Sequence, residues 1–73
     1  MQTGNRLLST MKTYILQRDL PNMRKGHFFV PCRNEKGVEE YFSFVPNGNG
    51  AFITFDPEYV ENNSEWFLPE ENN

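Results

Sequence analysis

The stretch PNGNG, residues 46–50, separates two runs of apolar residues and constrains the fold more than any other segment of the chain. Asn and Gly adopt the positive φ angles of tight hairpin turns at little steric cost, and two Asn-Gly pairs occur here in succession. The run before it, VEEYFSFV, and the run after it, AFITF, are rich in aromatic and β-branched residues. The sequence therefore predicts an antiparallel pair of strands joined by a tight turn.

Two further strands are predicted at residues 12–17 and 27–30, where apolar side chains alternate between two faces. Phe28 and Phe29 must then point to opposite sides of the sheet. Pro31 lacks a backbone N–H and is expected to end the second of these strands.

The segment FDPEYVENN, residues 55–63, predicts a short helix near the C-terminus. Asp56 is a favourable N-cap residue, Pro57 suits the first helical position, and Glu58 complements the positive end of the helix dipole. Asn62 and Asn63 are expected to end it in left-handed geometry. Such a helix is too short to be stable alone, so it must dock on the sheet. The residues assigned this structural role are Asp56, Tyr59, Trp66 and Phe67.

The length and the aromatic content together indicate one small domain. A chain of 73 residues is near the lower limit for a stable core, and seven Phe, three Tyr and one Trp compensate with large side chains. No window sustains a helical apolar period over several turns. The expected fold is therefore mainly β: a small SH3-like barrel or a curled antiparallel sheet of four to five strands, with one short helical turn. Residues 12–68 would form this domain, between a flexible extension at 1–11 and a disordered acidic tail at 69–73.

The side chains that carry most enzyme chemistry are scarce. The chain has one His and one Cys, and His27 and Cys32 are an odd number of residues apart, so on one strand they would face opposite ways. One Cys and one His cannot supply a multi-cysteine zinc site, and DPEYVENNSE lacks the EF-hand spacing. We therefore expect no catalytic residues, no metal ligands and no cofactor, and a protein that is not an enzyme. The single Cys also fits a reducing intracellular setting.

The charges divide the sequence in two. Residues 1–37 carry a formal charge of +5 and residues 38–73 one of −8. This asymmetry predicts two partner-binding surfaces, one basic and aromatic and one acidic. The first comprises Arg24, Lys25, His27 and Phe29, and the second comprises Glu58, Glu61 and Glu65. The two halves would instead neutralise each other if they interleave in the fold.

Three kinds of partner fit these surfaces. A protein partner is the main expectation. Nucleic acid is one alternative, which would bind through the basic and aromatic face of residues 18–29. Another is a basic protein, which the acidic residues would inhibit by mimicking DNA. The chain could be a monomer or a homodimer that pairs its opposite charges. No apolar run approaches the roughly 20 residues of a membrane span, and the start MQTGNRLLST has no signal-peptide segment. No membrane partner is therefore expected.

The segments YILQRDLPNMRKG and FDPEYVENNSEWF resemble a module that recurs in bacteriophage and mobile-element proteins of Gram-positive bacteria. In that module a Tyr-rich strand runs into a DLP…KG turn, and the chain ends in a segment like P-E-x-V-E-N-N-P-E-W-F. The similarity spans residues 12–68, with Ser64 in place of the expected Pro. The resemblance implies a small phage accessory domain with a β-barrel-like fold and no catalytic residues. It also implies the cytoplasm of a bacterial host cell as the location, and an inhibitor of a host protein as one such role.

Overall fold

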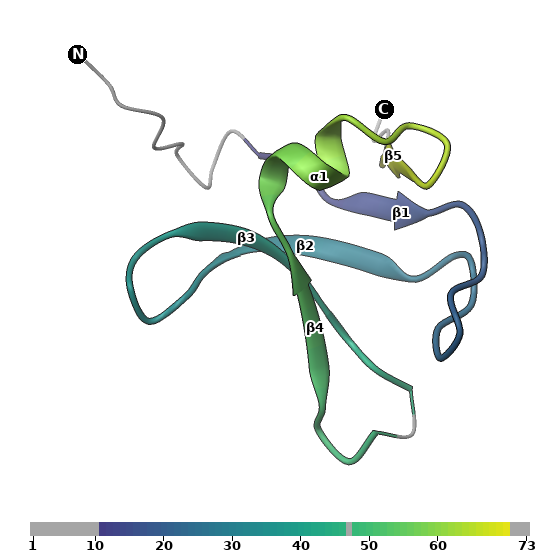
Figure 1. The fold of residues 1–73 in the computed structure, drawn as a ribbon, viewed down its shortest axis with the longest axis horizontal. Coiled ribbons are helices and arrows are strands. Elements are labelled where there is room, and N and C mark those ends of the chain that lie inside the picture. Colours follow the sequence, from purple (N-terminus) through teal and green to yellow (C-terminus); the bar gives the residue numbers. More distant parts are fainter. Residues whose placement is uncertain (1–10, 47, 71–73) are drawn as a thin grey trace.

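The computed structural model describes residues 11–46 and 48–70, which form an open antiparallel sheet and one short helix (Figure 1). Along the chain the elements are β1 (Tyr14–Leu16), β2 (Phe28–Arg33), β3 (Glu39–Phe44), β4 (Phe52–Phe55), α1 (Pro57–Glu61) and β5 (Phe67–Pro69). The strands lie in the order β4-β3-β2-β1-β5, and every neighbouring pair is antiparallel. The predicted mainly β fold with a short C-terminal helix is confirmed. The prediction allowed either a small barrel or a curled sheet. The structure is an open sheet, because β4 and β5 lie at opposite edges and do not pair.

The hairpin between β3 and β4 is the one predicted from PNGNG. The backbone N–H of Ala51 donates to the carbonyl of Gly48 at 3.0 Å, and the two residues between them have positive φ, 54° at Asn49 and 89° at Gly50. Positive φ at both central positions is what a primed hairpin turn requires. Asn47 lies outside the described residues. The strands then run in register, with Phe44 opposite Phe52.

Strand β2 continues through Pro31 to Arg33, so the prediction that Pro31 ends it is wrong. The carbonyl of His27 bonds to β1, whereas the N–H of Asn34 bonds to the carbonyl of Val38 on the β3 side. The backbone groups of successive residues in a strand point alternately to its two neighbouring strands. The nitrogen of Pro31 therefore points to the β1 side, away from β3. Pairing with β1 covers only Phe28 and Phe29, so Pro31 removes no hydrogen bond from the sheet.

Strand β5 was not predicted as a separate strand, and it joins the two ends of the domain. The N–H of Gln17 donates to the carbonyl of Trp66, and the N–H of Glu70 donates to that of Thr13, both at 2.8 Å. Pro69 and Glu70 therefore belong to the folded domain rather than to the predicted tail, whose residues 71–73 lie outside the described residues. At the other end Met11 packs against the core, and residues 1–10 of the predicted extension lie outside the described residues.

The core lies between one face of the sheet, α1 and the loop before β2. Its buried members are Leu16, Met23, Phe29, Tyr41, Val60 and Phe67. The ring of Phe29 is 5.5 Å from that of Phe55 and 5.4 Å from that of Phe67, so one side chain of β2 contacts the strand before the helix and the strand after it. Aromatic pairs at such distances add to the free energy gained by burial.

Helix α1 begins after Asp56, as predicted, but by a different mechanism. The Asp56 backbone is extended and Pro57 occupies the first turn, yet the Asp56 side chain makes no capping hydrogen bond. Its backbone carbonyl instead accepts from the N–H groups of Tyr59 and Val60. The expected left-handed end is also wrong, because Asn62 has φ −102° and no positive φ occurs at Asn63.

The residues assigned structural roles differ in how deeply they lie. Phe67 is buried, and Trp66 is half-buried against the core. Tyr59 is half-exposed, although its ring is 5.1 Å from that of Phe55.

No helix within residues 11–46 and 48–70 is long and apolar enough to cross a membrane.

Candidate interaction face

The outward side of the sheet carries a group of exposed apolar side chains. Phe28 is 51% exposed, Phe44 61% and Phe52 59%. The register accounts for this: alternate residues of each strand face the core, and the residues between them face solvent. We call this surface the outer aromatic face, which consists of Phe28, Val30, Phe42, Phe44 and Phe52.

The rings of the outer aromatic face contact one another. The Phe42 ring lies 4.9 Å from that of Phe44 and 5.1 Å from that of Phe52. Beside them a shallow groove of about 430 Å³ is lined mainly by apolar side chains from β2 and β3 and ends at His27 and Pro46. Apolar patches of this kind on small proteins commonly mark binding sites.

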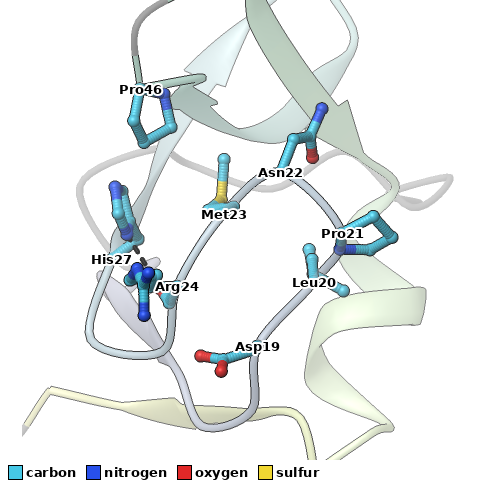
Figure 2. A pocket seen from close by; sticks show the side chains of 8 residues that line it. All are labelled: Asp19, Leu20, Pro21, Asn22, Met23, Arg24, His27 and Pro46. Atoms are coloured by element: carbon cyan, nitrogen blue, oxygen red, sulfur yellow. Dashed lines mark hydrogen bonds between the residues drawn. The ribbon is translucent and has the colours of Figure 1, made fainter.

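A second hollow, of about 540 Å³, adjoins the groove at His27 and Pro46 (Figure 2). Its wall is the loop of residues 19–24. Nδ1 of His27 donates to the backbone carbonyl of Arg24 at 2.8 Å, and Oδ1 of Asp19 accepts from the N–H of Lys25 at 2.9 Å. Figure 2 shows the Arg24 and His27 side chains close together on one side of the hollow. The Arg24 guanidinium and the His27 ring therefore line this hollow together with the carboxylate of Asp19.

Of the four residues predicted for the basic and aromatic surface, one is not accessible to a partner. Arg24, Lys25 and His27 come from the loop beside the groove, but Phe29 is fully buried and cannot contact a partner. Its neighbour Phe28 is the exposed ring. Alternation requires that these two residues point to opposite sides, but it does not identify the covered side, and the prediction chose the wrong one.

Two of the acids in the predicted acidic surface interact with other residues of the domain. Glu58 is exposed, Glu61 accepts a hydrogen bond from the hydroxyl of the buried Tyr41, and Glu65 pairs with Arg18 at 3.4 Å. The Arg18 guanidinium also lies 5.4 Å from the centre of the Trp66 ring. Two of the three acids thus have partners within the domain.

Replacing Tyr41 by Phe is expected to lower the free energy of unfolding by about 1–2 kcal/mol, because it deletes the 2.9 Å hydrogen bond from the Tyr41 hydroxyl to Glu61 Oε2. Urea denaturation followed by circular dichroism measures this loss. Glu61→Gln is the matched control, since its amide oxygen can still accept the bond, and it should cost less. An unchanged unfolding midpoint for Tyr41→Phe would mean that the bond contributes nothing.

A buried carboxylate in β3 was not foreseen. Glu39 is buried on the core side of the sheet, and Arg33 Nε donates to Glu39 Oε2 at 2.9 Å. Arg33 itself is half-exposed, so the pair connects the end of the β2–β3 hairpin to the core edge. We assign it a structural role, because it lies in neither hollow.

Cys32 is poorly suited to act as a nucleophile. Burial, and next the charge of Glu40 opposite it, raise the pKa of the Cys32 thiol and so favour the unreactive protonated form. His27 precedes the other end of β2. Within the described residues no group of three or more His, Cys, Asp or Glu could hold a metal ion.

Phe42, Phe44 and Phe52 are absent from the predicted contact residues. The signal for them was present, because both VEEYFSFV after Tyr41 and AFITF have apolar residues on both of their faces. A strand with two apolar faces must leave one uncovered unless a second layer covers it.

No model of a protein family matches the chain, and comparisons with curated proteins and with solved structures find no match either.

Proposed function

We propose that the protein is a non-enzymatic interaction module that binds a partner protein through the outer aromatic face. The observation that carries this proposal is the exposure of Phe28, Phe44 and Phe52 on one side of the sheet. Phe28 and Phe44 line the apolar groove, and the rings of Phe44 and Phe52 both contact that of Phe42. Aromatic side chains are enriched in protein interfaces and provide much of the binding free energy there. A domain of this size is only marginally stable, and exposed Phe side chains do little to stabilise it. Three of them on one side of the sheet therefore indicate a role in binding.

The charges around the face favour a protein over nucleic acid. Arg24 and His27 line the hollow that adjoins the groove, whereas Glu40 shares the face of β3 with Phe42. A protein that binds single strands needs cations along the path of the phosphates as well as rings for stacking. The Phe side chains do provide such rings, so nucleic acid is the second candidate. The acidic inhibitor has less support, because Glu61 and Glu65 already have partners within the domain.

The resemblance to phage accessory modules supports the choice of partner. On that basis the partner would be a host protein in the bacterial cytoplasm, with a protein of the phage as the alternative. The apolar groove and the Arg24 guanidinium in the adjoining hollow suggest a partner segment that presents apolar side chains next to a carboxylate.

A quantitative capture experiment tests the proposal. Tagged wild-type protein, the double variant Phe44→Ser/Phe52→Ser and the control Val38→Ser are used to capture proteins from a bacterial lysate, with and without nuclease. Val38 is equally exposed but lies outside the outer aromatic face. We expect a discrete, nuclease-resistant protein whose recovery falls at least about tenfold for the double variant and is unchanged for the control. Equal recovery by all three would contradict the proposal, and recovery only with intact nucleic acid would favour the second candidate.

A further inference from the structure

Strand β4 is an open edge of the sheet. The carbonyl of Ala51 accepts from the N–H of Val45, so the backbone groups of Ala51, Ile53 and Phe55 point to β3. Those of the intervening Phe52 and Thr54 point away from it. In residues 11–46 and 48–70 no strand lies beyond β4 to pair with these two residues.

The other edge of the same sheet is protected. There the backbone of Leu68 faces β1, so the outward positions of β5 are Phe67 and Pro69. Pro69 has no N–H to offer, and β5 has only three residues. Short strands and proline are the usual protection against unwanted pairing, together with charged side chains. Residues 51–55, AFITF, contain neither a charge nor a proline.

We propose that β4 pairs with β4 of a second copy of this chain, antiparallel and about a two-fold axis. The register centred on Ile53 uses the whole stretch 51–55. Phe52 and Thr54 of each copy then exchange backbone hydrogen bonds with Thr54 and Phe52 of the other. The two sheets become one continuous sheet.

The side chains fit this register. Phe52 stands directly opposite Thr54 of the second copy, and aromatic with β-branched pairs are favourable across antiparallel strands. The nearest charged residue, Asp56, comes opposite Gly50 of the second copy, so no like charges meet even though each chain is acidic. A partner with a free strand could use the same edge, but a second copy offers a matching uncharged edge at the same concentration. The inference does not depend on the proposed function, and it places the two outer aromatic faces next to each other.

Mass measurements by analytical ultracentrifugation, from about 10 µM to about 1 mM, test the proposal on the full chain. We expect twice the chain mass at the upper concentrations. Thr54→Pro removes an outward N–H without touching the bonds to β3, and Phe52→Lys places a charge on the edge. Both should be monomeric with unchanged circular dichroism. Thr54→Val keeps the N–H and the branched shape and should remain dimeric.

A monomeric wild type throughout the range, or a dimer that survives both edge variants, would overturn the proposal. So would a dimer that is lost in Phe44→Ser but retained in Thr54→Pro. The last result would indicate contact between outer aromatic faces instead. A dimer that dissociates in high salt would likewise indicate pairing of opposite charges. In hydrogen exchange the Phe52 amide should be protected only at dimeric concentrations. The capture variant Phe44→Ser/Phe52→Ser also changes this edge, so Thr54→Pro separates the two proposals: it should lose the dimer and still capture the partner protein.

Discussion

Replacing Phe29 by Ala is expected to lower the free energy of unfolding by about 3–5 kcal/mol, the largest effect of any single substitution considered. The side chain is fully buried and its ring contacts those of Phe55 and Phe67. A domain of this length has a total stability of roughly 4–11 kcal/mol, so the variant should be close to unfolded. The melting temperature should fall by about 15 °C or more.

Thermal and urea unfolding followed by far-ultraviolet circular dichroism measure this loss. Phe28→Ala is a closely matched control, because it deletes the same side chain from the adjacent residue of the same strand. Phe28 faces solvent, so its replacement should cost less than about 1 kcal/mol. Similar melting temperatures for the two variants would show that the sheet does not bury the face assigned to Phe29.

Replacing Trp66 by Ala is expected to cost about 2–3 kcal/mol, less than the full loss for a completely buried ring. Trp66 is half-buried, packs against the core and immediately precedes β5. One face of its ring also receives the Arg18 guanidinium at 5.4 Å. The loss combines the burial of a large ring with a cation–π contact worth about 0.5–1 kcal/mol at an exposed site.

The control separates these two contributions. Arg18→Ala deletes the cation and its exposed ion pair with Glu65 but leaves the Trp66 ring in place, so it should cost no more than about 1 kcal/mol. Urea denaturation followed by circular dichroism suits both variants, because one of them lacks the only Trp. If Trp66→Ala unfolded at the same urea concentration as the wild type, the ring would be free to contact a partner.

Local chemistry accounts for the elements that sequence reasoning identified correctly. Gly50 adopts positive φ because it has no Cβ, and Asn49 because a short polar side chain tolerates that geometry. Pro57 starts a helix because its ring presets φ. The parts that were wrong depend on contacts distant in the sequence. Strand β5 exists because β1 offers it an edge, and its short FLP segment has no alternation of its own to reveal it.

The same division applies to the candidate site. Arg24, Lys25 and His27 are near neighbours in the sequence, so their grouping could be predicted. The outer aromatic face draws on β2, β3 and β4, and its grouping depends on the register between them. Glu61 was expected on the surface, but the hydroxyl of Tyr41, twenty residues away, binds it.

The sequence by itself determined that this chain has a β hairpin at PNGNG, alternating strands and a short proline-initiated helix, because each follows from the torsional preferences of a few neighbouring residues. Only the tertiary structure decided which of the two apolar sides is covered. In FFV and YFSF both sides can bury Phe, and the choice depends on where α1 and the loop bearing Met23 pack. That choice placed Phe29 in the core and left Phe28, Phe44 and Phe52 exposed.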